Sequence, residues 1–151
     1  MTTHTESTRT HRSRIQMVSA VFGAVFLLVG ILGFVPGITK DLDTIMFAGH
    51  HSHAALLGIF QVSVLHNIVH LLFGVVGLLG LRSRGLAKTY LVVGGIVYGV
   101  LWIYGLVVPM ESMGNFVPLN TADNWLHFVL AVAMVTTGIV FGRKARTVSQ
   151  R

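Results

Sequence analysis

The chain contains no cysteine, and only 11% of its 151 residues are charged. Without thiols the protein cannot form disulfides, iron–sulfur clusters or thiolate metal sites. A soluble domain carries roughly a quarter charged residues. The shortage of charge therefore excludes an ordinary soluble domain, even though the length is that of a single domain.

Hydrophobic residues take the place of the missing charge. They make up 53% of the chain, and the mean hydropathy is +0.74. The formal net charge is +6, but the basic residues lie in short segments between apolar runs and do not form a soluble basic face. This distribution excludes nucleic acid as a partner and indicates the lipid bilayer instead.

Four uncharged or nearly uncharged runs are long enough to cross a bilayer, which needs about 20 apolar residues. The sequence therefore predicts an all-α integral membrane protein, a four-transmembrane-helix bundle over residues 15–142. The predicted spans are residues 15–35, 58–81, 89–108 and 124–142. The flanking segments, 1–14 and 143–151, are polar and basic, and we expect the first to be a disordered cytoplasmic tail.

The basic residues are distributed asymmetrically across this bundle. Ten of the eleven Lys and Arg residues fall in the two tails and in the connection that holds Arg82, Arg84 and Lys88, whereas Lys40 falls on the opposite side. The positive-inside rule then places both termini in the cytoplasm. In the first outer loop, residues 36–57, Asp41 or Asp43 could cap a short interfacial helix that ends near Gly49.

The second half of the chain resembles the first. "HNIVH" at 66–70 and "DNWLH" at 123–127 share an Asn-x-x-His pattern at the outer end of a span. The spans before them, "FGAVFLLVGILGFVP" and "GGIVYGVLWIYGLVVP", both end at a proline with a glycine a few residues earlier. These matches suggest two repeated helical hairpins of the same topology, related by an axis along the membrane normal. The glycines in the first and third spans are predicted close-packing positions between helices.

Polar residues interrupt the second and fourth spans at helical spacing. His66 and His70 are separated by four positions, as are Asp123 and His127, so each pair shares one helix face. Asn67 and Asn124 lie on or beside the same faces, three positions before a histidine. Because such stripes are costly against lipid, we expect them to face the bundle interior and form a buried cluster between the second and fourth helices.

Several interpretations of this cluster remain open. In the structural one, Asn67, Asn124 and the histidines hydrogen-bond between helices, and no cofactor is needed. In the second, His66, His70, Asp123 and His127 are transition-metal ligands, or His70 and His127 are axial ligands of haem b. In the third, the cluster is a path for protons or small solutes. The "GHHSH" tract at 49–53 is either a metal-binding tract or a set of exposed loop histidines.

The stretches "GIFQVSVLHNIVHLLFGVVGLLG", "LGFVPGIT" and "NTADNWLHFVLA" resemble the bacterial membrane-protein family catalogued as domain of unknown function 4383. The resemblance covers about residues 15–142. It implies a four-helix protein of the bacterial inner membrane and no established reaction. The positions that match its motifs are His66, Asn67, His70, Asp123, Asn124 and His127.

No nucleophile–base pair, phosphate-binding loop or nucleotide fingerprint is present in the sequence, so we expect no enzymatic activity. The sequence thus favours a non-enzymatic structural or accessory protein of the inner membrane, which would act as a homo-oligomer or with another membrane protein. A metal- or haem-binding redox protein and a transporter are the alternatives.

Overall fold

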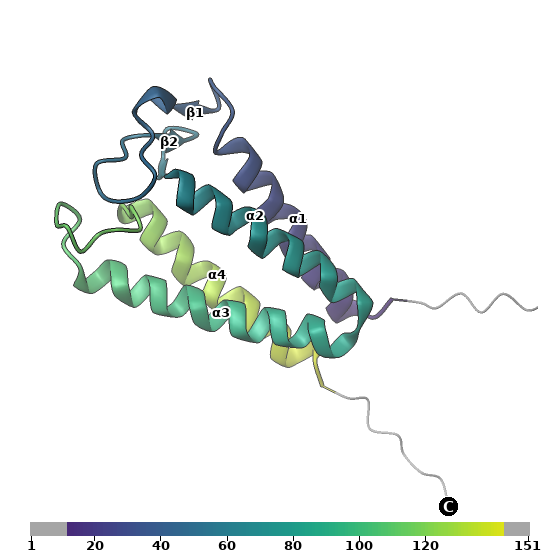
Figure 1. The fold of residues 1–151 in the computed structure, drawn as a ribbon. Coiled ribbons are helices and arrows are strands. Elements are labelled where there is room, and N and C mark those ends of the chain that lie inside the picture. The colour runs from purple at the N-terminus through teal and green to yellow at the C-terminus, as the bar shows by residue number, and fades with distance from the viewer. Residues whose placement is uncertain (1–11, 144–151) are drawn as a thin grey trace, which may run out of the picture.

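The computed structural model describes residues 12–143, and four long helices dominate it (Figure 1). The helices are α1 (Arg14–Leu32), α2 (Val64–Leu79), α3 (Arg84–Val107) and α4 (Thr121–Phe141), and a short 3-10 helix, η2 (Gly80–Arg82), continues α2. All four are long and apolar enough to cross a membrane, α2 together with η2. This confirms the prediction of four membrane-length helices. Most of the two predicted basic tails lies outside the described residues.

The helices pack as two hairpins, with α1 along α2 and α3 along α4. Glycines allow the close approach inside each hairpin. A Cβ atom added to Gly23 would lie 2.7 Å from the backbone nitrogen of Leu78, and one added to Gly95 would lie 2.9 Å from that of Val135. Neither glycine can therefore carry a side chain without moving the facing backbone, as expected for small residues between membrane helices.

Side-chain caps determine where three of the helices begin. The Ser63 hydroxyl accepts a hydrogen bond from His66 N, and the Ser83 hydroxyl accepts one from Leu86 N, both at 3.1 Å. Asn120 caps α4 by accepting from Asp123 N at 3.0 Å. Each cap satisfies a backbone donor that the first helical turn leaves free. Consequently α2 begins later than residue 58, whereas α3 and α4 begin before residues 89 and 124.

The loop between α1 and α2 folds into a small three-stranded sheet that the sequence did not predict. Its strands are β1 (Thr39–Lys40), β2 (Ala55–Leu56) and β3 (Phe60–Gln61), antiparallel in the order β1-β2-β3. Ala54, Leu56 and Val62 form a buried cluster beneath it, against the C-terminal end of α1. The helix expected between Asp41 and Gly49 is reduced to a 3-10 turn, η1 (Leu42–Thr44), because Ile45 is extended and packs against that cluster.

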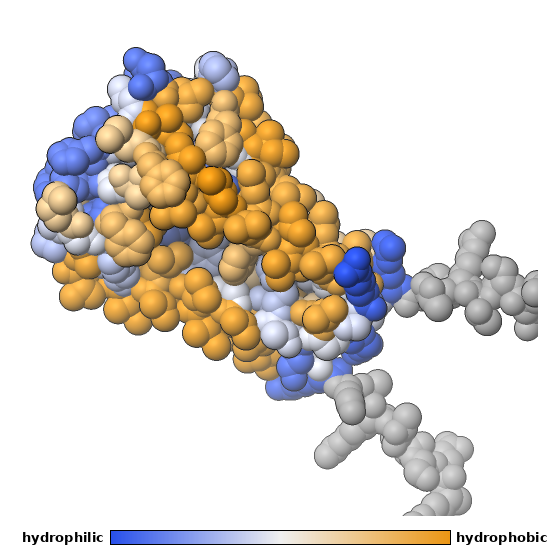
Figure 2. Space-filling view, in the orientation of Figure 1, coloured by the Kyte–Doolittle hydropathy of each residue, from blue (hydrophilic) through white to orange (hydrophobic). Residues whose placement is uncertain are grey.

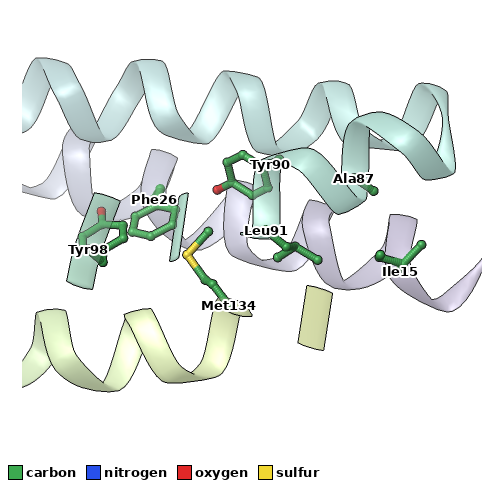
Figure 3. Close-up of a cluster of buried hydrophobic side chains, with 7 residues drawn as sticks. All are labelled: Ile15, Phe26, Ala87, Tyr90, Leu91, Tyr98 and Met134. Atoms are coloured by element: carbon green, nitrogen blue, oxygen red, sulfur yellow. The ribbon is translucent and has the colours of Figure 1, made fainter. Parts of the chain in front are cut away.

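The main core lies where the two hairpins meet. Phe26 of α1 stacks on Tyr98 of α3, with ring centroids 5.4 Å apart and an interplanar angle of 5°. Tyr90, Leu91 and Met134 fill the space toward the end of the bundle at which α1 and α3 begin (Figure 3). Aromatic stacking of this kind adds about 0.5–1.5 kcal/mol to the burial of the rings, so this core helps hold the hairpins together.

The outer surface of the helices is broadly hydrophobic, and hydrophilic residues gather at the two ends (Figure 2). Large apolar side chains are exposed on every helix, among them Val21, Leu28, Leu72, Ile96, Val100 and Val132. A continuous apolar surface of this kind is rare on soluble monomers. It is the surface that a bilayer requires, so the helices are expected to contact lipid.

Candidate functional site

Three histidines converge near the N-terminal ends of α2 and α4. His66 and His70 lie one turn apart on α2, and their rings stack with centroids 4.5 Å apart. The ring of His127, on α4, lies 6.3 Å from that of His66. His70 and His127 are each about 9 Å along their helices from the first residue, at a rise of 1.5 Å per residue. The histidine part of the predicted stripes therefore comes together about two turns into the bundle, from the end at which α2 and α4 begin.

The hydrogen bonds of the cluster define what its ring nitrogens offer. His70 Nδ1 lies 2.9 Å from the backbone oxygen of His66. Because that oxygen can only accept, His70 Nδ1 carries the proton, and Nε2 of the neutral ring is left as an acceptor. The buried Nδ1 atoms of His66 and His127 have no hydrogen-bond partner within residues 12–143. Unpaired buried polar atoms are costly and call for an explanation.

The three rings line a cavity of about 250 Å³ between α2, α3 and α4. Tyr98 and Phe116 contribute aromatic walls, and most of the remaining lining is aliphatic. The Tyr98 ring lies 5.2 Å from that of His127, centroid to centroid. An apolar cavity with a few convergent polar groups is the usual form of a small-molecule site.

The two asparagines lie away from this cavity and do not face each other. Asn67, which is 1% exposed, packs on Gly33 at the end of α1. Asn124 packs in the same way on Gly105 near the end of α3. A Cβ atom at either glycine would overlap the asparagine amide. Each asparagine therefore fits against the first helix of its own hairpin, an arrangement that spacing along one helix does not reveal.

Asp123 ties the loop between α1 and α2 to α4. Its Oδ2 atom accepts hydrogen bonds from Gln61 N and from Asn120 N, each at 3.0 Å. The Asn120 side chain donates to Ile59 O at 2.7 Å and strengthens the same connection. Asp123 is 2% exposed. A buried carboxylate needs such donors, and here they come from the loop backbone.

The structure thus divides the four predicted metal ligands. His66, His70 and His127 surround the cavity, whereas Asp123 binds the loop backbone. In the part of the chain that the structure describes, no group of three or more His, Asp or Glu side chains is arranged to hold a metal ion.

Two residues of the loop between α1 and α2 were not predicted from the sequence. The buried hydroxyl of Ser52, within the "GHHSH" tract, donates to Val62 O at 2.6 Å. Gln61 donates through Nε2 to Ser52 O at 2.6 Å and through its backbone to Asp123. A polar residue at the edge of an apolar run, as in "GIFQVSVL", was the available signal for Gln61.

Comparison with known proteins identifies the family. A family model described as a domain of unknown function, DUF4383, matches residues 16–140. The chain belongs to this family. The DUF4383 match confirms the resemblance inferred from the sequence motifs, and it includes both the histidine cavity and the two Gly–Asn contacts. No curated protein and no solved structure matches the chain.

Proposed function

We propose that this DUF4383 protein is a non-enzymatic structural or accessory protein of the bacterial inner membrane. The observation that carries the proposal is the use of its buried polar side chains. Asn67 and Asn124 fit against glycines, and Asp123 ties a loop to a helix. The two asparagines act through packing alone, since Asn67 Nδ2 and Asn124 Oδ1 have no hydrogen-bond partner within residues 12–143, whereas Asp123 acts through hydrogen bonds to the backbone. Polar side chains that are used in these ways hold helices in register in membranes.

We further propose that the two hairpins are copies of one unit. Equivalent contacts support this, because each hairpin has a glycine against facing backbone, a glycine under an asparagine and a capped second helix. The corresponding residues are Gly23 with Gly95, Gly33 with Gly105, Ser63 with Asn120, Asn67 with Asn124, and His70 with His127. The offset is 72 residues for the first helices and 57 for the second. Phe26 and Tyr98, also 72 residues apart, stack on each other as expected at a pseudo-twofold axis.

Double-mutant cycles at the two Gly–Asn contacts test this proposal. Gly33→Ala should destabilise the protein because the new methyl group overlaps the Asn67 amide. Asn67→Ala should relieve that overlap, giving a coupling of about 0.5–3 kcal/mol. The Gly105→Ala and Asn124→Ala cycle should give a coupling of the same sign and similar size. Thermal unfolding in detergent measures all four stabilities of each cycle. Coupling at one contact and additivity at the other would contradict equivalent hairpins.

We also propose that both termini are cytoplasmic. Arg14, Arg82, Arg84 and Arg143 occupy one end of the bundle, where the Arg84 guanidinium reaches Arg143 O at 3.5 Å. The acidic Asp41 and Asp43 belong to the loop at the other end. The positive-inside rule assigns the basic end to the cytoplasm.

Because the chain has no cysteine, single cysteines report this orientation cleanly. His51→Cys and Arg84→Cys both replace exposed side chains. In intact cells, a membrane-impermeant maleimide should label His51→Cys and leave Arg84→Cys unlabelled until the cells are opened. Labelling of Arg84→Cys alone in intact cells would reverse the proposed orientation.

A further inference from the structure

The histidine cavity is accessible from the side of the bundle. Val69 of α2 and Val97 of α3 line it, and they are 46% and 42% exposed. Both residues lie within helices that are long and apolar enough to cross a membrane. A surface exposed at that level faces lipid. The cavity therefore admits molecules that are dissolved in the bilayer.

A second cavity, of about 290 Å³, continues along the same seam toward the basic end. Phe73 and Val76 of α2 and Val93 of α3 line it, and Val97 belongs to both cavities. The helices α2 and α3 contact each other much less than the helices within each hairpin do. In Figure 2, paler residues lie between the two hydrophobic bands of the hairpins. We refer to the two cavities, which share Val97, together as the α2–α3 groove, with the histidines at one end of it.

The three histidines at one end of this groove can both donate and accept hydrogen bonds. His70 Nε2 is an acceptor, because Nδ1 of the same ring donates to the His66 carbonyl. The Nδ1 atoms of His66 and His127 are buried and unpartnered within residues 12–143, so each of these neutral rings can meet a ligand in the cavity through Nε2, as donor or as acceptor according to its tautomer. This set suits an uncharged head group that carries carbonyl or hydroxyl groups.

The walls of the cavity indicate the shape of that head group. The rings of Tyr98, Phe116 and the three histidines line it, and flat side chains favour a flat aromatic ligand. Its 250 Å³ is below the roughly 300 Å³ at which pockets for drug-sized molecules begin. The space therefore fits a one- or two-ring head better than a haem. A fatty-acid carboxyl group would leave most of it unfilled.

We propose that the cavity binds the head group of a membrane-soluble quinone or quinol, whose apolar tail lies in the α2–α3 groove. A quinone carbonyl accepts a hydrogen bond from protonated Nε2 of His66 or His127, and a quinol hydroxyl donates to His70 Nε2. The proposal concerns binding alone. It goes beyond the structural role proposed above and does not depend on it, since either can fail without the other.

Intrinsic fluorescence offers a direct test with the full-length protein in detergent. Trp102 and Trp125 both pack on Phe128, the residue that follows His127 in the sequence. Their ring centroids lie 4.8 and 6.0 Å, respectively, from the ring centroid of Phe128. Quinones quench tryptophan emission, so titration with decylubiquinone should give saturable quenching. His66→Leu and His127→Leu should each weaken the affinity about threefold to tenfold, as expected for the loss of one hydrogen bond.

A matched pair on α3 separates cavity binding from partitioning into the micelle. Val97→Phe should fill the cavity mouth and weaken binding about tenfold or more. Val100→Phe, one turn away and 61% exposed to the surroundings, should leave the affinity unchanged. If Val97→Phe does not fold, Val69→Phe takes its place, with the exposed Leu72 as the site of its control, Leu72→Phe.

Several results would overturn the proposal. Quenching that does not saturate, or equal losses in Val97→Phe and Val100→Phe, would mean that the quinone only partitions into detergent. Palmitic acid that binds more tightly than decylubiquinone would assign the cavity to a carboxyl lipid. Stoichiometric metal by elemental analysis, or a Soret band that His127→Leu removes, would assign the histidines to a metal ion or haem.

Discussion

Gly23→Ala should strongly destabilise the protein. The added methyl group would lie 2.7 Å from Leu78 N and 2.8 Å from Gly74 O. Both atoms belong to the backbone of α2, so no side-chain rotation can relieve the contact, and the hairpin must open. Overpacking of a well-packed interior typically costs about 1–3 kcal/mol, sometimes more. Because the contact is with backbone, we expect the upper end of that range.

The matched control for this change is Gly99→Ala on α3. A Cβ atom there would meet only the Cβ atom of Ala131, at the ordinary distance of 3.9 Å. Alanine is favoured over glycine in a helix by about 1 kcal/mol, so this variant should be as stable as the original protein or more so. Circular dichroism during heating in detergent measures both. Equal melting temperatures for the two variants would mean that α1 and α2 are not in close contact at Gly23.

Asp123→Ala should detach the loop between α1 and α2 from α4. The change leaves the partly buried backbone donors of Gln61 and Asn120 without their acceptor. Each unsatisfied buried donor costs about 1–3 kcal/mol, so the loss should lower the melting temperature clearly. It should also expose residues 36–63 to added protease before the helices unfold.

Asp123→Asn is the informative comparison. A single oxygen atom, Oδ2, accepts both hydrogen bonds in the structure, and the side-chain oxygen of asparagine can occupy the same place. This variant should therefore keep most of the stability and the protease resistance of the loop. If it were as damaging as Asp123→Ala, the negative charge of Asp123, and not its two hydrogen bonds, would account for the effect.

The features that sequence patterns predicted well are local ones. The hydropathy of about 20 consecutive residues decides whether a segment can cross a bilayer, and all four spans were recognised on that basis. The i, i+4 spacing of His66 and His70 placed their side chains on one helix face, and their rings do stack. Helix starts were predicted less closely, because caps such as Ser63 and Ser83 depend on one hydroxyl and barely change the mean hydropathy of a window.

The loop between α1 and α2 shows the limit of this kind of reasoning. Its strands are two residues long, too short for an alternating pattern to be recognised. They form because Ala54, Leu56 and Val62 are buried against the end of α1 and because Asp123, far along the chain, binds the backbone of β3. Neither partner is visible in the loop sequence itself.

By itself, the amino-acid sequence determined the membrane class, the number of spans and the polar face of each second hairpin helix, since these depend on composition and on spacing within one helix. Only the tertiary structure decided which group each polar residue meets. Asn67 and Asn124 share the stripe of the histidines in sequence, yet they pack on Gly33 and Gly105, whereas the histidines line a cavity. The reason is geometric. Glycine contacts set the rotation and separation of neighbouring helices. These in turn determine which part of a polar stripe meets a glycine and which part lines a cavity.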